Sequence, residues 1–242
     1  MNTLCIIPAR YASTRMPGKP LADIAGKPMI QHVYERASLA SLPSTVLVAT
    51  DHEAVRDAVL SFGGQVVMTS PHHVTGTDRL AEVAARSEAD VIINVQGDEP
   101  LIEPQLIDDL ATEFLDNPDL VMATAMTTLT EADYHDANVV KVVTDLQGYA
   151  LYFSRSLIPF LRHTPQRSVY KHIGIYAYRR AFLLDFAKLA PTPLELTESL
   201  EQLRALEHGY KIKVLPTAYN PVGVDTPEDL AQVIQIIKRG AL

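Results

Sequence analysis

Short continuous apolar stretches alternate along this chain with longer stretches in which apolar residues recur at helical spacing. Continuous apolar runs are typical of strands buried on both faces of a parallel sheet, and the spaced pattern is typical of the helices that cover it. The runs predict strands at residues 5–7, 45–50, 65–68, 91–95 and 121–128, and the spaced pattern predicts helices at 28–40, 52–62, 77–86 and 104–115. This alternation predicts a doubly wound, mostly parallel α/β sheet.

The rhythm changes from residue 138 onward. Two runs rich in Val and Tyr flank a turn at Gln147-Gly148, which predicts a hairpin and therefore an antiparallel β extension. Capping signals, Thr192 with Glu195 and Thr226 with Asp229, predict the start of two late helices. The remaining predicted elements are a strand at 169–178, a helix at 178–188, a helix at 192–207, a strand at 211–215 and a last helix at 226–238. We expect one domain spanning residues 1–242.

Composition narrows the class of protein. Hydrophobic residues make up 47% of the chain and charged residues 21%, and no apolar run approaches the ~18 residues of a membrane span, which predicts a soluble protein with no membrane partner. The N-terminus lacks the basic flank of a signal peptide. The single cysteine, Cys5, lies in an apolar strand, so we expect a buried thiol and a cytoplasmic location. A net charge of -8 argues against nucleic-acid binding and favours a small ligand.

The basic residues gather in one loop. The apolar run that begins the chain stops at Pro8, and Arg10, Arg15 and Lys19 follow together with Ser13 and Thr14. Cations, hydroxyls and backbone N–H groups at the carboxyl end of a strand are what a polyphosphate requires. The alternative is a solvated basic loop, which the glycine and prolines that fix the loop's shape disfavour. We therefore expect a polyphosphate-binding loop that begins at about Pro8.

Acidic residues follow a later strand. Asp98 and Glu99 come directly after the run at 91–95, and Asp225 immediately precedes the last helix. The carboxyl ends of strands in an open α/β sheet are where ligands bind, so Asp98 is expected in a site. We expect no metal site at the neighbouring His72 and His73, because their side chains diverge and no further His or Cys lies at a suitable spacing. Dinucleotide-binding, P-loop and serine-hydrolase motifs do not occur in the sequence.

The basic loop resembles the N-terminal signature of the cytidylyltransferases that activate acidic sugars, and within them the 3-deoxy-manno-octulosonate cytidylyltransferases. Six further segments match that family in order: residues 76–80, 94–100, 152–155, 172–176, 200–204 and 224–230. The resemblance implies a Rossmann-like nucleotidyltransferase fold. It also implies transfer of CMP from CTP to 3-deoxy-D-manno-octulosonate, with release of pyrophosphate, in lipopolysaccharide synthesis.

The resemblance also implies roles for individual residues. Mg²⁺ is the expected cofactor, held by Asp98 and Asp225, a donor set that Mg²⁺ accepts because it completes its octahedron with phosphate and water. The expected catalytic residues are Asp98, Lys19, Arg15 and Asp225. The expected nucleotide-binding residues are Ala9, Arg10, Ser13, Arg15, Lys19, Thr75, Gly76 and Thr77. The expected sugar-binding residues are Gln96, Arg155, Arg162, His172, Tyr176, Glu201 and Gln202.

Alternatives concern the sugar and the assembly. Lys171 stands where the family commonly has arginine, Ala177 where it has glycine, and the connection at 162–170 is short, which leaves the exact octulosonate open, including an 8-amino relative. The nearest rival enzyme is a CMP-sialate synthetase. A non-catalytic nucleotide sensor is disfavoured because both Asp98 and Asp225 are present. We expect residues 138–178 to bind sugar and to form a homodimer interface, since a β extension rich in Val, Tyr and Phe needs cover.

Overall fold

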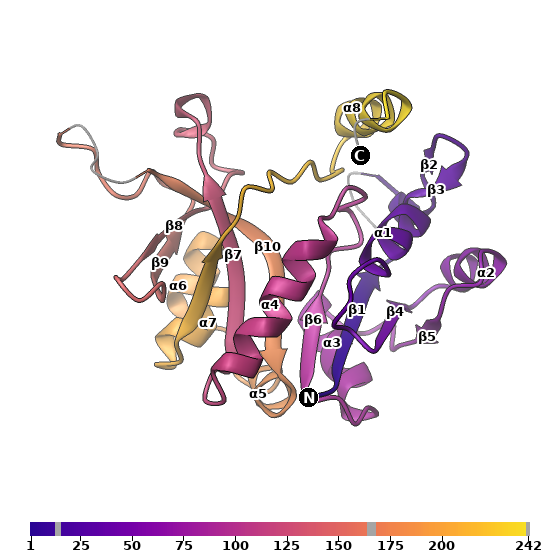
Figure 1. Ribbon diagram of the computed structural model, residues 1–242, viewed down its shortest axis with the longest axis horizontal. Helices are drawn as coiled ribbons and strands as arrows, with labels where there is room; N and C mark the ends of the chain where they lie inside the picture. Colours follow the sequence, from indigo (N-terminus) through magenta and orange to yellow (C-terminus); the bar gives the residue numbers. More distant parts are fainter. Residues whose placement is uncertain (13–15, 164–167, 241–242) are drawn as a thin grey trace.

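A nine-stranded mixed sheet runs through the computed structural model, which describes residues 1–12, 16–163 and 168–240 (Figure 1). Seven strands lie side by side in the order β11 (Ile212–Pro216), β7 (Met122–Thr128), β10 (Tyr170–Arg179), β6 (Val91–Asn94), β1 (Thr3–Ala9), β4 (Thr45–Thr50) and β5 (Val66–Met68). The predicted hairpin forms β8 (Lys141–Thr144) and β9 (Ala150–Ser154), and β8 pairs with β10. The mostly parallel sheet with an antiparallel extension is confirmed.

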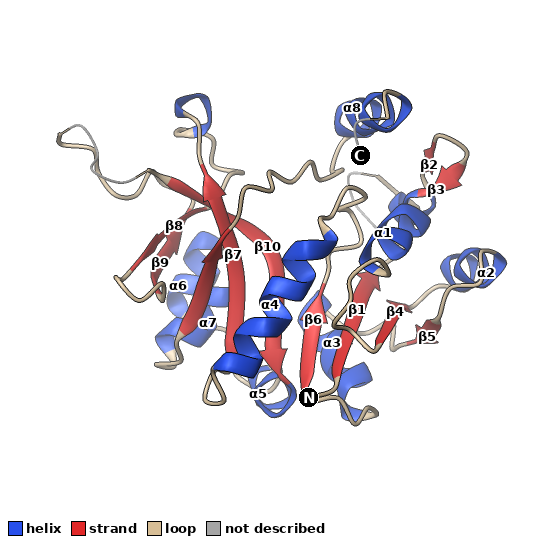
Figure 2. Cartoon of the chain, in the orientation of Figure 1, coloured by secondary structure: helices blue, strands red, loops and turns tan. Residues whose placement is uncertain are grey.

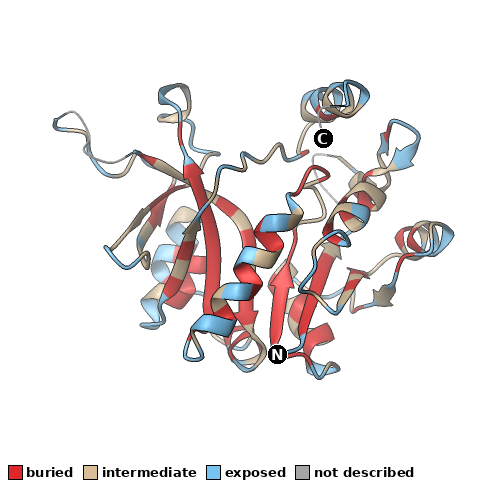
Figure 3. Cartoon of the chain, in the orientation of Figure 1, coloured by how far each residue is buried: buried red, intermediate tan, exposed pale blue. Residues whose placement is uncertain are grey.

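Helices cover both faces of the sheet, as doubly wound topology requires. The core on one face includes residues of α1 (Met29–Ala37), α2 (Glu53–Ser61) and α4 (Pro104–Asp116). The core on the other face includes residues of α3 (Gly76–Ala85), α5 (Arg180–Phe186) and α7 (Gln202–Glu207). Successive side chains of β1 point to opposite faces, so the strand contributes to both cores. Cys5 and Ile7 lie in the first core, and Leu4 and Ile6 lie in the second. Figure 3 shows β1 and β6 as the buried centre.

Strand β10 was predicted, but its place was not. It lies between β7 and β6 and is antiparallel to both, so one reversed strand interrupts an otherwise parallel centre. Tyr176 of β10 pairs with Asn94 on one side and with Thr124 on the other, and a bulge separates Ile173 from Tyr176. Such pairing joins residues far apart in sequence, and periodicity carries no information about it.

Strand β1 continues through Pro8, where the sequence predicted that a loop begins. Pro8 is in register with Ala49 of β4. The carbonyl of Ile6 accepts from Val95 N–H on the β6 side, and residues two apart in a strand point to the same side, so the missing N–H of Pro8 falls on that side. Pairing between β1 and β6 ends at Ile6 with Asn94. The proline therefore costs no ladder hydrogen bond.

Three further boundaries differ from the prediction. Thr75, and not Thr77, caps α3, since its side chain accepts from Asp78 N–H and the Asp78 carboxylate accepts from Thr75 N–H. Pro28 belongs to the small hairpin of β2 (Asp23–Ile24) and β3 (Lys27–Pro28), one residue before α1 begins. The helix expected at 192–207 is two helices, α6 (Pro193–Glu198) and α7, because Ser199 takes the left-handed conformation at φ 52°.

After β11 the chain runs as a strap, residues 217–226, along the carboxyl ends of the parallel strands to α8 (Pro227–Lys238) (Figure 2). Val224 and Val233 are buried together with Ile24 and Met29, which fastens the strap and α8 onto the small hairpin. Two single-turn helices, η1 (Lys19–Leu21) and η2 (Glu131–Asp133), complete the described elements. Within residues 1–12, 16–163 and 168–240, every helix is too short or too polar to cross a membrane.

Candidate active site

A pocket of about 440 Å³ lies where β1 and β6 end. Its walls come from segments distant in sequence: the end of β1, η1, the start of α3, the loop after β6 and the strap. The lining residues are Pro8, Ala9, Arg10, Ala12, Lys19, Pro20, Met29, Gly76, Gln96, Gly97, Asp98 and Asp225. Seven residues expected in the site, Ala9, Arg10, Lys19, Gly76, Gln96, Asp98 and Asp225, are thus brought to one cavity.

Gly97 lets the loop after β6 pack against the end of β1. A Cβ atom at Gly97 would lie 2.7 Å from the carbonyl oxygen of Pro8, a separation that real Cβ atoms do not reach. Glycine is therefore required for this close approach. The contact brings Asp98, the next residue, beside η1, where Lys19 lies.

Lys19 joins the two expected metal ligands. Its Nζ donates to Asp98 Oδ2 at 2.7 Å and to Asp225 Oδ1 at 2.9 Å. The carbonyl of Asp98 also accepts from Val224 N–H at 2.9 Å, which holds the strap beside the loop. Burial opposes the charge on Lys19, but the two carboxylates outweigh it, and the pKa of Lys19 is raised. The charged form is thereby stabilised.

The amino end of α3 forms another wall. Gly76 is its first residue, and the guanidinium of Arg10 donates to the carbonyl of Val74 at 3.0 Å. A helix amino end carries partial positive charge and unpaired N–H groups, which suit an anion. Thr77 donates from its hydroxyl to Glu201, and burial raises the pKa of that carboxyl. This contact links the nucleotide candidates on α3 with the sugar candidates on α7.

Three sugar candidates lie around β10. Gln96 donates to the carbonyl of Gly174 at 2.9 Å, and the rings of His172 and Tyr176 are 5.4 Å apart. His172 Nε2 lies 2.9 Å from the hydroxyl of buried Thr124. Burial lowers the pKa of His172 from 6.5 to about 3, so the imidazole stays neutral, and it raises the pKa of Tyr176. These rings act as neutral hydrogen-bonding groups at neutral pH.

Gln96 lines this pocket, and the other sugar candidates, His172, Tyr176, Glu201, Arg155, Arg162 and Gln202, do not. Arg155 donates to the carbonyls of Glu198 and Ala137 at 2.7 and 2.9 Å, so it ties β9 to the junction between α6 and α7. Gln202 is buried, 5% exposed. Arg162 lines a second pocket of about 480 Å³ on the protruding extension. Ser13, Thr14 and Arg15 lie outside the described residues.

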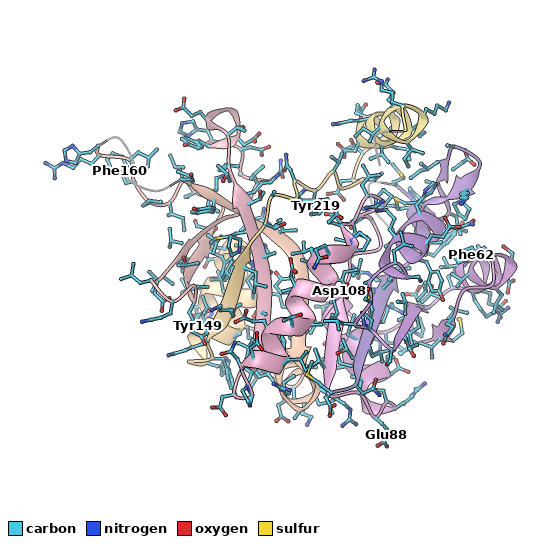
Figure 4. The ribbon with its side chains drawn as sticks, in the orientation of Figure 1. Phe62, Glu88, Asp108, Tyr149, Phe160 and Tyr219 are labelled. Atoms are coloured by element: carbon cyan, nitrogen blue, oxygen red, sulfur yellow. The ribbon has the colours of Figure 1, made fainter. Side chains whose placement is uncertain are left out.

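Sequence reasoning assigned no role to a partly buried pair beside Asp98. Tyr219 on the strap, labelled in Figure 4, donates from its hydroxyl to Glu99 Oε2 at 3.2 Å. Burial raises the pKa of Glu99 to about 7, and the neighbouring Asp98 charge adds to the effect. The two residues are 120 positions apart, and periodicity and capping signals connect no such pair. A tyrosine within an otherwise loop-like stretch was the one available signal.

Cations facing paired carboxylates in a strand-end pocket suit a nucleoside triphosphate and a divalent ion. A cytidylyltransferase family model matches residues 4–212. The 3-deoxy-manno-octulosonate cytidylyltransferase of Geobacter sulfurreducens is 56% identical in an alignment of 250 positions, gaps included, which covers 98% of this chain and 100% of that protein. The structure of a CMP:2-keto-3-deoxy-manno-octonic acid synthetase complexed with CTP has a TM-score of 0.96 at 45% identity, covering 99% of this chain and 100% of the other.

A more distant structure, the 4-diphosphocytidyl-2C-methyl-D-erythritol synthase of Anaerococcus prevotii, covers 98% of this chain and 99% of its own with a TM-score of 0.66. At 13% identity it supports the fold alone. The family model spans the basic loop, the acidic loop after β6 and the antiparallel extension, and the relatives match from end to end. This chain belongs to the cytidylyltransferase family.

Proposed function

We infer that this chain transfers CMP from CTP to 3-deoxy-D-manno-octulosonate, which supplies an activated sugar for lipopolysaccharide synthesis. The observation that carries the inference is the strand-end pocket in which Lys19 faces Asp98 and Asp225, in a chain 56% identical to a 3-deoxy-manno-octulosonate cytidylyltransferase. The names of the relatives do not favour the alternatives, a CMP-sialate synthetase or an 8-amino-octulosonate enzyme.

The reaction mainly requires that the two substrates be aligned and that the charge of the phosphates be neutralised. The anomeric hydroxyl of the sugar attacks the α-phosphorus of CTP and a new P–O bond forms. The bond from the α-phosphorus to the oxygen that bridges it to the β-phosphorus breaks, pyrophosphate leaves, and the hydroxyl proton passes to solvent. Lys19 and Arg10 supply positive charge where the triphosphate enters, and Gly76 offers the amino end of α3. Arg15, outside the described residues, is proposed to add a third cation.

Mg²⁺ is the proposed cofactor, because the donor set fits it. Asp98 and Asp225 are held within reach of one cation, Lys19 Nζ, and two carboxylates with phosphate and water oxygens are a usual set for Mg²⁺. No group of three or more His, Cys, Asp or Glu residues able to hold a metal occurs in the part of the chain that the structure describes. When bound, Mg²⁺ would neutralise phosphate charge.

The sugar is proposed to lie toward β10. Gln96, His172 and Tyr176 offer neutral hydrogen-bonding groups there, and Glu201 reaches the same region through Thr77. Burial lowers the pKa of Lys171, one residue before His172. Arg155, Arg162 and Gln202 keep their proposed sugar role only if the sugar extends from this pocket toward β9.

Pyrophosphate release tests the proposal. The purified protein is incubated with CTP, Mg²⁺ and one acidic sugar: 3-deoxy-D-manno-octulosonate, its 8-amino analogue or a sialic acid. We expect release with the first sugar to exceed the others by at least about tenfold, a difference of ~1.4 kcal/mol in transition-state stabilisation. Preference for another sugar, or CTP binding without turnover on any of them, would overturn the assignment.

A homodimer through residues 138–178 is also proposed. Leu146, Leu151 and Phe160 are 86%, 63% and 85% exposed, and Phe160 lies far out on the extension (Figure 4). Exposed apolar side chains of this size favour cover by another surface. Sedimentation at micromolar concentration is expected to show a dimer, and Leu151→Asp with Phe160→Asp is expected to give a folded monomer. A monomeric unaltered protein would contradict the proposal.

A cytoplasmic location is the last part of the proposal. Cys5, the one cysteine in the sequence, is buried, and burial raises the pKa of its thiol to about 12. No internal disulfide can therefore stabilise the fold, as is usual in a reducing compartment. Cell fractionation with an antibody to the protein checks this, and recovery outside the cytoplasm would contradict it.

A further inference from the structure

Lys19 occupies the space between the two expected metal ligands. Its Nζ is 2.7 Å from Asp98 Oδ2 and 2.9 Å from Asp225 Oδ1, and its side chain is 14% exposed. The backbone around it is restrained, since Gly18 takes the left-handed conformation at φ 70° and Pro20 fixes φ on the other side. The backbone of η1 therefore holds Lys19 in position for this contact.

One cation at a time fits between these oxygens. Mg²⁺ binds oxygens at roughly 2.0 to 2.1 Å, so an ion shared by Asp98 and Asp225 would lie almost where the ammonium now lies. Two positive ions so close would repel strongly in a partly enclosed pocket. Loading of a shared metal therefore requires that Lys19 move away.

The pocket offers the ammonium another partner. Lys19 carries its charge on a flexible four-carbon chain, and it lines the same cavity as Arg10, Gly76 and Gly97. A triphosphate in this cavity would give the displaced ammonium new anionic oxygens. After the exchange a divalent ion brings two positive charges to the carboxylate pair, and Lys19 brings one to the phosphates.

We propose that Lys19 is a placeholder cation, which holds Asp98 and Asp225 together in the ligand-free protein and yields them to the metal when nucleotide arrives. The proposal rests on the proposed function in so far as the two carboxylates are the metal ligands. Metal and nucleotide binding are then positively coupled, so divalent ions bind more weakly to the nucleotide-free protein than to the protein with CTP bound. Without the ammonium, a divalent cation would no longer compete with Lys19 for the two carboxylates.

Mn²⁺ binding in the absence of nucleotide and sugar tests this. Free Mn²⁺ is followed by electron paramagnetic resonance during titration of the unaltered protein, Lys19→Met and the matched control Arg10→Met. Arg10 lines the same pocket, but its guanidinium donates to the carbonyl of Val74. We expect Lys19→Met to bind Mn²⁺ at least about tenfold more tightly, as expected when a competing ion pair of charged hydrogen bonds is removed. Arg10→Met is expected to change the affinity by less than about threefold.

Two further measurements make each outcome decisive. Adding Asp98→Asn to Lys19→Met should abolish the gain in Mn²⁺ affinity if the ion lies between the carboxylates. In thermal melts, Mn²⁺ should raise the melting temperature of Lys19→Met more than that of the unaltered protein. The same melts report whether the variant folds. Equal gains in Lys19→Met and Arg10→Met, or no gain in either, would overturn the proposal. Because no sugar is present, failure here is separable from failure of the transfer reaction.

Discussion

Two neighbouring regions hold their polar groups in different ways: the pocket itself and the region around β10. On the loop side, formed by β1, η1, the loop after β6 and the strap, full charges meet directly: Lys19 contacts Asp98 and Asp225, whose side chains are 35% and 49% exposed. On the β10 side, formed by β7 and β10, neutral groups meet inside the protein, as His172 does with the hydroxyl of Thr124, which is fully buried.

The difference affects how easily a ligand can replace the partners of each group. Ion pairs that water reaches are held less strongly than fully buried ones, so ligands can replace their partners at smaller cost. Buried neutral networks are expensive to disturb, because an unpaired buried group loses its solvation. The loop side is therefore suited to charged, exchangeable ligands such as phosphates and metal ions, and the β10 side is suited to fixed recognition of shape and hydroxyl groups.

The largest expected effect comes from Asp98→Asn on the loop side. The substitution keeps the shape of the side chain but removes the charge expected to hold Mg²⁺, which predicts a loss of turnover on the order of a thousandfold, or ~4 kcal/mol. Pyrophosphate release at saturating CTP, sugar and Mg²⁺ measures it. Asp225→Asn should act similarly, and the double variant should be little worse than either, as for residues that work as a unit.

Glu88→Gln is the matched control for these carboxylates. Glu88 is exposed at the pole of the molecule opposite the pocket (Figure 4). It should leave turnover unchanged, while thermal melts confirm that all variants fold. Near-normal turnover of a folded Asp98→Asn protein would contradict the assignment of Asp98 as a metal ligand. Full additivity of the losses in turnover caused by Asp98→Asn and Asp225→Asn would argue against a shared ion.

Tyr219→Phe is expected to have the next largest effect. It removes the hydroxyl that donates to Glu99 and so leaves a partly buried carboxyl without that partner, which should cost about 1 kcal/mol of stability. The strap that carries Asp225 should lose part of its positioning, so kcat should fall more than KM for CTP rises. Urea denaturation and steady-state kinetics measure the two effects.

Tyr210→Phe serves as the control for Tyr219. Tyr210 packs edge-on against Phe182, away from the strap, and its side chain is 37% exposed. Its loss of a hydroxyl should change neither stability nor kcat appreciably. If both tyrosine variants behave alike, the contact between Tyr219 and Glu99 does not position the site.

The expected effect that is smallest at neutral pH is the pH dependence of stability on the β10 side. In the folded protein the pKa of His172 is lowered from 6.5 to about 3, so between these values the unfolded chain binds a proton that the folded protein does not. Stability therefore falls as pH drops below about 6.5, by about 1 to 2 kcal/mol at pH 5 for this partly buried ring. In His172→Gln, which keeps a polar group beside Thr124, the loss between pH 7 and pH 5 should shrink by that amount.

Urea denaturation of both proteins at the two pH values gives the comparison. His163→Gln, on the exposed extension, is the control, and its loss of stability between the two pH values should equal that of the unaltered protein. An unchanged pH dependence in His172→Gln would show that the imidazole is not held neutral by the fold.

Local patterns were enough for the central strands and the long helices, and not enough for breaks and caps. The apolar runs of β4 and β6 and the helical spacing of α4 were predicted to within a few residues, because burial on both faces imposes a continuous apolar run. The break at Ser199 and the true cap at Thr75 were missed, since each depends on contacts outside the immediate pattern.

By itself the sequence determined the alternation of strands and helices, the basic loop, and the two acids that follow or precede regular elements. Periodicity and capping are local properties, so they can be read from neighbouring residues. The tertiary structure alone decided that β10 runs antiparallel between β7 and β6, that Tyr219 reaches Glu99, and that Lys19 lies between Asp98 and Asp225. These contacts join residues up to 206 positions apart, and their geometry arises only when sheet order and packing bring the strand ends together.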